Sequence, residues 1–104
     1  MAIIAVSFRI ERDESSDEYN RRYKAITEKI KSYAVGSIWD ETTSFYLFES
    51  NETAGNIASG VYLLTEFRTD KELLLVINTS SRTDHSFKGA VKYPTTLNNL
   101  LDKR

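Results

Sequence analysis

The chain has 104 residues, a formal net charge of −1 and no cysteine. This length fits one domain of ordinary size, and a composition of 40% hydrophobic and 28% charged residues is close to that of average globular proteins. A disordered or fibrous chain, a second domain core and a disulfide framework are thereby excluded.

The sequence also carries signals about where the protein acts. No apolar run approaches the roughly 20 residues that a membrane-spanning helix needs, and the chain opens directly into an apolar run without a basic leader. Together with the absence of cysteine, these features predict a cytoplasmic protein without a membrane partner.

The charges are unevenly distributed along the chain. Residues 35–79 carry two basic and seven acidic groups, whereas residues 80–104 carry five basic and two acidic groups. A protein that depends on phosphate contacts usually has a clear basic excess, and this chain has none overall. The distribution permits a basic patch near the C-terminus but does not require nucleic-acid binding.

Residues 3–10 predict the first strand, because apolar and β-branched residues occupy both of its alternating sides. A helix follows, with Ser15 or Ser16 as its N-cap and Asp17 and Glu18 in its first turn. Its apolar residues recur with the period of one helical face. They are Tyr19, Tyr23, Ile26, Ile30 and Tyr33.

Three further strands are predicted from β-prone runs. Residues 35–39 and 43–48 predict the second and third strands, with a tight hairpin at the polar residues 40–42. Residues 72–78 are apolar on both faces and predict the fourth strand.

A second helix lies between the third and fourth predicted strands. Ser50 or Asn51 can cap it. We interpret its two glycines, Gly55 and Gly60, as positions where the helix approaches the sheet closely. Its predicted apolar face consists of Ala54, Ile57, Ala58, Val61 and Leu64.

The element order β-α-β-β-α-β predicts an α+β domain of the ferredoxin-like type with a four-stranded antiparallel sheet. We assign residues 1–104 to a single domain, of which residues 1–79 form the core. Residues 80–104 form a C-terminal extension with a short strand and helix, in which the step Phe87-Lys88-Gly89 precedes a helical pattern that begins at Pro94.

The first and fourth predicted strands are apolar on both faces, whereas two helices in this topology cover only one face of the sheet. Either the C-terminal extension folds back over the other face, or a second copy of the chain packs against it. We expect a homodimer through the open sheet face.

Three passages together with the element order carry a family resemblance. They are Ala5-Val6-Ser7-Phe8-Arg9-Ile10, Tyr33-Ala34-Val35-Gly36-Ser37-Ile38-Trp39 and Leu73-Leu74-Leu75-Val76-Ile77. They resemble the small proteins grouped with CRISPR-associated protein two, and above all their SinR-like relatives. In those relatives the final strand is followed by a glycine-containing aromatic step and a terminal helix that starts with proline, as at Phe87-Lys88-Gly89 and Pro94 to Leu101 here.

The resemblance implies a sheet-to-sheet homodimer that handles nucleic acid, as do the adaptation proteins of that family and the related VapD toxins. Many of these proteins carry an aspartate at the end of the first strand, where two copies can hold a divalent metal between them. The matching position here is Arg9, and two facing guanidinium groups would repel a metal. We therefore expect no metal site, unless Asp13 or Glu11 supplies the carboxylate.

The candidate nucleic-acid-binding residues are Arg9, Arg12, Arg82 and Lys88, because guanidinium and ammonium groups bind phosphate. The alternative is that these side chains pack their stems against the protein and extend their charged heads into water. Basic residues of the first helix are interspersed with acidic ones, as expected of a solvated face with mixed charges.

The candidate catalytic residues are His85 and Asp13. His85 is flanked by Asp84 and Ser86, but neighbours in sequence rarely present the geometry of a nucleophile, a base and an orienting group. The alternative is a solvated loop histidine. One histidine without cysteine cannot form a zinc site, and four scattered glycines supply no nucleotide-binding loop, so we expect no cofactor.

Three functions remain open from the sequence. The first is a catalytically degenerate, homodimeric relative of the CRISPR-associated protein two family that acts as a nucleic-acid-associated or protein-interaction module. The second is a small toxin-like endoribonuclease that uses Arg9, Asp13 or His85 in place of the missing carboxylate. The third is an interaction protein without a nucleic-acid role.

Overall fold

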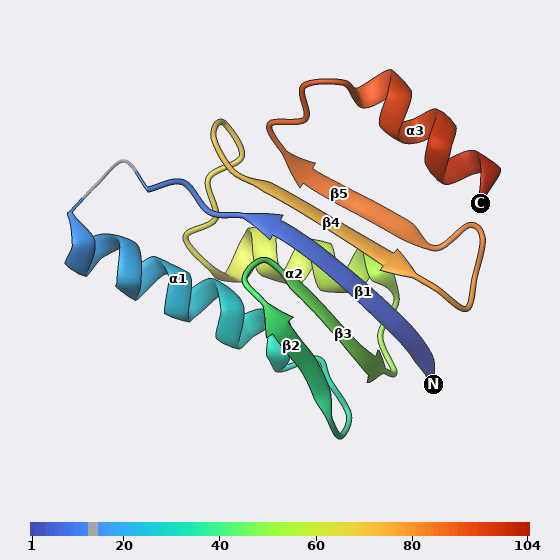
Figure 1. Ribbon diagram of the computed structural model, residues 1–104, viewed down its shortest axis with the longest axis horizontal. Coiled ribbons are helices and arrows are strands. Elements are labelled where there is room, and N and C mark those ends of the chain that lie inside the picture. The colour runs from blue at the N-terminus through green and yellow to red at the C-terminus, as the bar shows by residue number, and fades with distance from the viewer. Residues whose placement is uncertain (13–14) are drawn as a thin grey trace.

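One antiparallel sheet organises the chain. The computed structural model describes residues 1–12 and 15–104, and within them five strands pair in the order β2-β3-β1-β4-β5 (Figure 1). The strands are β1 (Ala2–Arg9), β2 (Ile38–Thr42), β3 (Phe45–Ser50), β4 (Leu73–Asn78) and β5 (His85–Gly89). The helices of the described residues are α1 (Ser16–Lys31), α2 (Ala54–Leu64) and α3 (Pro94–Lys103).

The α+β class predicted from the sequence is confirmed. The prediction placed four strands in the sheet and a short strand in the C-terminal extension, whereas in the structure that strand, β5, pairs with β4 and becomes the fifth. Gly89, at φ +110, ends β5 where any side chain would collide with the Glu72 carbonyl group. The amide of Ala90 donates to the same carbonyl oxygen at 2.8 Å, which fixes the extension to the sheet edge.

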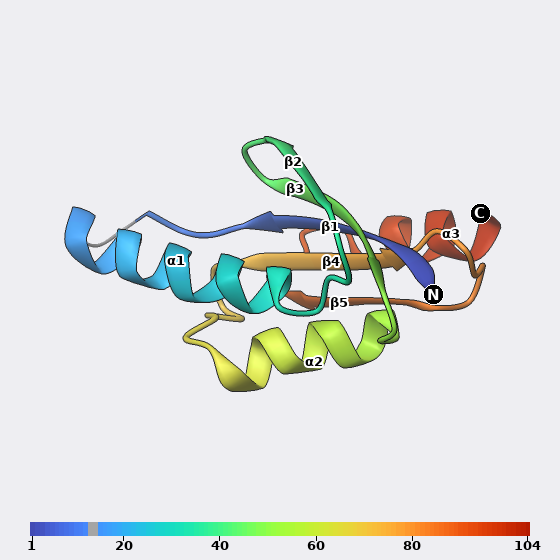
Figure 2. The same ribbon diagram turned by 90° about the horizontal axis from the view of Figure 1, so that it is seen from below.

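The helices are distributed unequally over the two faces of the sheet. Figure 2 shows α1 and α2 beneath one face, and α3 lies along the outer edge of β5 rather than across the sheet (Figures 1 and 2). Among the described residues no helix crosses the centre of the opposite face, which we call the open face. No helix in this described part is long and apolar enough to cross a bilayer.

The hydrophobic core lies between the sheet and the helices α1 and α2. Along β1, Ile4, Val6 and Phe8 are buried and alternate with more accessible residues, as the two-residue period of a strand requires. The same alternation holds in β3 and β4. The helices add the buried side chains Ile26 and Ile30 from α1 and Ala54, Ile57, Ala58 and Val61 from α2.

Helix α1 begins as the sequence predicted. The Ser15 side chain accepts a hydrogen bond from the Glu18 amide at 3.2 Å, so Ser15 rather than Ser16 is the N-cap. Acidic residues in the first turn and basic residues in the last turn complement the helix dipole.

The β2–β3 hairpin differs in register from the prediction, because the turn lies at residues 43–44 instead of 40–42. Gly36 has a φ of +85, in the left-handed region that favours glycine, and residues 35–37 belong to the connection from α1, so only residues 38 and 39 of the predicted second strand lie in β2. The polar residues 40–42 belong to β2, whose pairing with β3 is irregular between Trp39 and Thr42.

Helix α2 is capped by Thr53, whose hydroxyl accepts from the Asn56 amide at 3.0 Å, and not by Ser50 or Asn51. Ser50 instead ends β3. The close approach predicted at the helical glycines occurs at Gly60, where a Cβ would overlap the Tyr33 hydroxyl group, so the partner is a side chain beyond α1 rather than the sheet.

A buried carboxylate fastens β1 and β4 to the helices. Glu72 is fully buried and accepts hydrogen bonds from the backbone amides of Glu11 and Arg68, each at 2.8 Å. It also forms an ion pair with the buried guanidinium group of Arg22 in α1. The charge of Glu72 is therefore compensated by a cation and by two amide donors, as a buried carboxylate requires.

Candidate functional site

The open face of the sheet carries two rows of mostly apolar side chains that run across the strands. Side chains alternate between the faces, so each of these residues is a sequence neighbour of a residue that points toward the helices. The first row, in sheet order, is Trp39, Leu47, Ala5, Ile77 and His85. The second row is Phe45, Ser7, Leu75 and Phe87.

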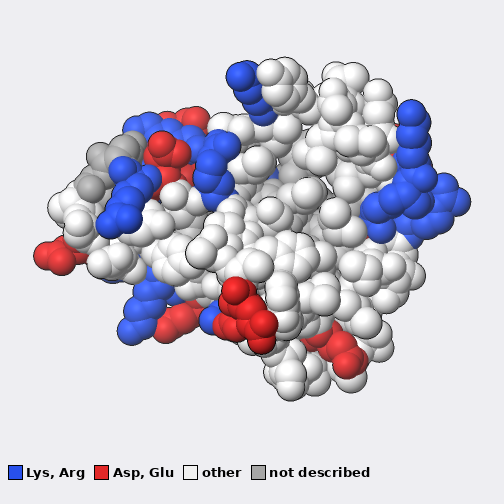
Figure 3. Space-filling view, viewed as in Figure 1, with Lys and Arg blue, Asp and Glu red and all other residues white. Residues whose placement is uncertain are grey.

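The outer residues of this face are open to solvent. Ile3 is 45% exposed and Trp39 is 43% exposed, and the Trp39 ring packs edge-on against Phe45 with 6.1 Å between ring centroids. In Figure 3, which views the open face, uncharged side chains cover the centre and the charged ones gather at the margins. An uncharged, partly apolar surface with a charged margin is typical of a protein interface.

The two edges of the open face differ in charge. Residues 38–50, which form the β2–β3 hairpin, contain Asp40, Glu41 and Glu49 and no basic residue. Residues 79–104, which contain β5 and α3, carry five basic and two acidic residues. Asp40 forms an exposed ion pair with Lys31 at 3.1 Å, whereas Glu41 is exposed at the hairpin. The exposed charges near the two edges therefore differ in sign, with Glu41 at the hairpin and Lys92 beyond β5.

A groove of about 350 Å³ lies beside α3, at the end of the sheet where β1 finishes; we call it the α3 groove. Two cations, Arg9 and Lys92, and the exposed ring of Tyr93 border it. Its apolar lining comes from Leu73 in β4, Ala90 and Val91 after β5, and Leu97 and Leu100 in α3. An apolar groove bordered by cations suits an acidic segment that also carries apolar side chains.

The predicted nucleic-acid-binding residues do not form one patch. Arg9 is exposed at the end of β1, where its Nη2 donates to the Lys71 carbonyl oxygen at 3.1 Å. Arg12 is exposed beyond β1, with its guanidinium carbon 5.0 Å from the centre of the Tyr19 ring. Both lie at the end of the sheet where β1 finishes.

Arg82 and Lys88 lie elsewhere. Arg82 belongs to the β4–β5 loop at the opposite end of the sheet, and its Nε donates to the Arg104 carbonyl oxygen at 2.6 Å. Lys88 is paired with Leu74, which points toward the helices, and its Nζ lies 5.7 Å from the centre of the Tyr62 ring in α2. A single phosphate group or a straight backbone therefore cannot contact all four predicted residues on one face.

The sequence neighbours of His85 do not join it on its own face. It lies on the open face opposite Ile77, and its Nδ1 is 3.3 Å from the Arg104 Nη2. Ser86 is opposite Val76 and points to the other face, while the Asp84 carboxylate accepts from Asn78 and from the first amide of α2. The nucleophile, base and orienting group of a triad are not assembled here. Asp13, the other predicted catalytic residue, lies outside the described residues.

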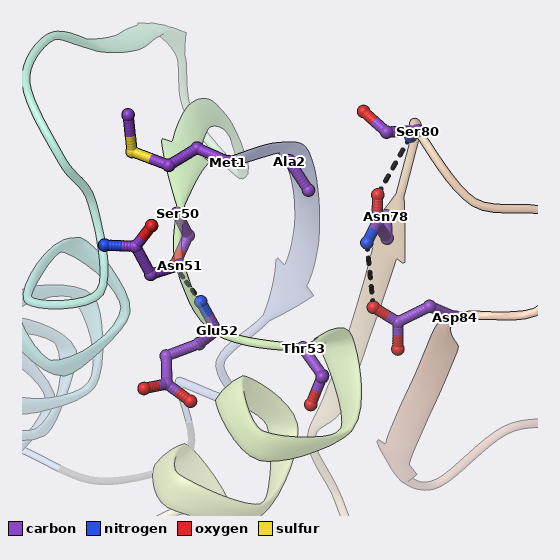
Figure 4. A pocket seen from close by; sticks show the side chains of 9 residues that line it. All are labelled: Met1, Ala2, Ser50, Asn51, Glu52, Thr53, Asn78, Ser80 and Asp84. Carbon is purple, nitrogen blue, oxygen red and sulfur yellow. Dashed lines mark hydrogen bonds between the residues drawn. The ribbon is translucent and has the colours of Figure 1, made fainter.

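A polar pocket of about 290 Å³ lies at the N-terminal end of α2 (Figure 4). Its polar groups bond mainly to one another: the Asn78 Nδ2 donates to Asp84 at 2.9 Å, and the Ser80 amide donates to the Asn78 Oδ1 at 2.9 Å. Asp84 accepts two contacts from the Ala54 amide, at 3.0 and 3.2 Å, and so stabilises the helix N-terminus. These contacts give the pocket a structural role.

The described residues do not form a set of metal ligands. No group of three or more histidine and carboxylate side chains there is placed to hold a metal ion. Glu11, which was considered as a substitute for the missing aspartate, uses its amide to bond Glu72 near the end of β1.

The sequence predicted the open face but missed the α3 groove. Arg9 was recognised as a candidate on its own, whereas the groove depends on where the terminal helix lies relative to Leu73. The apolar residues Leu97 and Leu100 in the last helix were the available signal, because an amphipathic helix buries its apolar face against something.

Comparisons of the chain with family models, with curated proteins and with solved structures gave no match. The function is therefore argued from the geometry of the open face, its charged edges and the α3 groove.

Proposed function

We propose that this chain is a non-catalytic homodimeric interaction module, in which two copies pair through the open faces of their sheets. The observation that carries the proposal is the contrast between neighbours on β1, since Ile4 is fully buried and Ile3 is 45% exposed. A single chain leaves the apolar rows of the open face accessible, and a second copy offers an identical apolar surface to cover them.

A pairing of standard size would cover a modest share of the surface of the chain. A standard interface buries about 800 Å² on each partner, which is roughly one-eighth of the 6197 Å² surface of the chain. An enzymatic role is less well supported, because His85 and its neighbours in sequence point in different directions.

The family relationship is part of the same proposal. The element order up to β4 and the strand order β2-β3-β1-β4 are compatible with a ferredoxin-like layout to which β5 would add an edge strand. A catalytically degenerate relative of the CRISPR-associated protein two family would have this layout and would lack the aspartate that Arg9 replaces. The proposal of a dimer depends on the apolar open face and stands apart from this kinship.

The direct test compares two charged substitutions at exposed apolar positions. Ile3→Glu places a carboxylate on the open face, whereas Leu63→Glu places one on α2, where Leu63 is 70% exposed. Size-exclusion chromatography with light scattering should give a dimer for the wild type and for Leu63→Glu, and a monomer for Ile3→Glu. A monomeric wild-type protein at high concentration would refute the proposal.

A second candidate function is contact with nucleic acid through the C-terminal segment. The observation in its favour is the net charge of residues 79–104, where five basic residues outnumber two acidic ones. Exposed cations of this segment, among them Arg82 and Lys103, are available to phosphate groups. Binding driven by phosphate contacts must weaken as the salt concentration rises.

The test of this candidate uses labelled RNA and DNA with magnesium or with a chelator. Binding at low salt that weakens on raising the salt, with the substrates left intact, would support a nucleic-acid-associated module. Cleavage that tracks the protein concentration would instead favour the toxin-like endoribonuclease. Intact, unbound substrates at low salt would leave the interaction module without a nucleic-acid role.

A further inference from the structure

We infer that the two copies pair about a two-fold axis parallel to the strands, so that the β2–β3 hairpin of each copy lies in the α3 groove of the other. This inference rests on the proposed homodimer and specifies its arrangement. It assigns the groove beside α3 to one occupant, the acidic hairpin of a second copy of the chain.

The charges at the two edges of the sheet distinguish the possible arrangements. When two sheets face each other, an axis parallel to the strands brings the β2 edge of one copy to the β5 edge of the other. An axis across the strands instead brings like edges together. Glu41 is exposed at the hairpin, whereas two cations, Arg9 and Lys92, border the α3 groove toward the other edge. Opposite charges meet only in the parallel arrangement, which is therefore favoured.

The hairpin and the groove also lie at the same end of the strands. The Phe8 amide donates to the Ser44 carbonyl oxygen at 3.1 Å, which places the hairpin turn beside the end of β1. Arg9 and Leu73, which line the α3 groove, are paired with each other at this same end. Rotation about an axis parallel to the strands preserves position along them, so each hairpin turn reaches the partner's groove.

The shape of the open face points to the same arrangement. Figure 2 shows the β2–β3 hairpin rising above the sheet on the open side, at the edge opposite β5. A raised hairpin obstructs flat stacking of two sheets unless the partner provides a hollow, and the α3 groove of about 350 Å³ is such a hollow. The arrangement also covers two exposed aromatic side chains, Trp39 on the hairpin and Tyr93 at the groove.

Engineered cysteines can test the arrangement, because the chain contains no cysteine of its own. The test variant carries Thr43→Cys at the hairpin turn and Thr96→Cys in the α3 groove, both at exposed positions. Within one chain Thr43 lies at the turn next to β3 and Thr96 lies in α3 beside β5, so at least three strand spacings, roughly 14 Å, separate them, beyond the reach of a disulfide. The control variant keeps Thr43→Cys and adds Thr83→Cys in the β4–β5 loop, at the other end of the sheet.

Mild oxidation followed by non-reducing electrophoresis gives the result, with the oligomeric state of the wild type measured in parallel. We expect a covalent dimer from the Thr43/Thr96 variant and at most a small fraction of that yield from the control. A wild-type dimer whose Thr43/Thr96 variant forms no more covalent dimer than the control would overturn this arrangement and leave the proposed homodimer intact. A monomeric wild type would overturn both.

A charge exchange gives an independent measurement. Arg9→Glu alone and Glu41→Arg alone should each weaken the dimer about tenfold in dissociation constant, because each places like charges together. The double variant should recover most of the affinity. Additive weakening without recovery would contradict a contact between the hairpin of one copy and the groove of the other.

Discussion

The two faces of the sheet are built from alternating residues of the same strands, yet they differ in almost every physical property. On the face toward the helices, Ile4 and Val6 are fully buried. On the open face, Ile3 and Trp39 are nearly half exposed, and the charged residues are sorted into an acidic edge and a basic edge. The first face is completed by the chain itself, whereas the second offers a surface that fits a partner.

Apolar residues on the two faces of one strand therefore have different roles. Those on the covered face stabilise the fold of one chain, because they are removed from water within it. Those on the open face contribute their full hydrophobic free energy only when a partner removes them from water. Substitutions on the covered side should therefore change the free energy of unfolding most.

Removal of the buried carboxylate of Glu72 should lower the free energy of unfolding most. Glu72→Ala removes the carboxylate that pairs with the buried guanidinium group of Arg22 and accepts from two backbone amides, and we expect the free energy of unfolding to fall by about 3–5 kcal/mol in urea denaturation. The matched control is Glu66→Ala, which removes an exposed ion pair with Arg21. Its loss should stay below about 1 kcal/mol. Equal losses in the two variants would contradict a special role for the buried pair.

Truncation of adjacent isoleucines compares the two faces directly. Ile4→Ala opens a cavity in the core and should lower the free energy of unfolding by about 2–5 kcal/mol. Ile3→Ala should cost less than about 1 kcal/mol when measured at concentrations too low for pairing, since its side chain is partly solvated already. Similar losses for both variants at low concentration would show that the open face is covered within one chain.

Alkaline pH should lower the free energy of unfolding through the Tyr46 hydroxyl on the covered face. Burial, followed by the influence of Tyr23, raises the pKa of the Tyr46 hydroxyl from 10.0 to about 12. The unfolded chain therefore releases this proton first, so this contribution to stability is complete below pH 10 and is lost as the pH rises to about 12. The contribution is on the order of 2 kcal/mol.

The measurement for Tyr46 is a series of urea denaturations between pH 9 and 12, with Tyr46→Phe as the control. The wild type should lose stability more steeply over this interval than the variant, which has no proton to release at this position. Parallel pH profiles would contradict the attribution to Tyr46.

The smallest predicted effect concerns the cap of α1, a helix that covers the sheet. Ser15→Ala removes the acceptor for the Glu18 amide and should cost about 1 kcal/mol in thermal or urea unfolding. Ser16 is the first residue of α1 and not its N-cap, so Ser16→Ala should leave the free energy of unfolding nearly unchanged. The reverse order of the two losses would show that the N-cap is misassigned.

Periodicity was sufficient to predict the α+β class and the buried face of β1, because side chains there follow the period of the strand. In α1 it found the buried Ile26 and Ile30, but it placed Arg22, which is buried, on the solvated face. It failed at the β2–β3 turn, where Gly36 and an irregular pairing shift the strands by several residues. It also failed at Leu64, which continues the apolar period of α2 but is exposed at the last residue of the helix.

The candidate site was predictable only in part. The open face followed from strands that are apolar on both sides, and Arg9 followed from its place at the end of β1. The α3 groove did not, because it depends on the packing of α3 beside Leu73 and Arg9, which lie far away in sequence. The separation of Arg82 and Lys88 from Arg9 was equally hidden, since strand pairing decides which end and which face each residue occupies.

The most direct test of the central claim, that a second copy covers the open face, is sedimentation equilibrium of the wild-type protein over a wide range of concentrations. A chain of 11.9 kDa that pairs as proposed should approach twice this mass at high concentration and dissociate on dilution. A mass that stays at 11.9 kDa throughout, with the apolar rows of the open face still in water, would contradict the account.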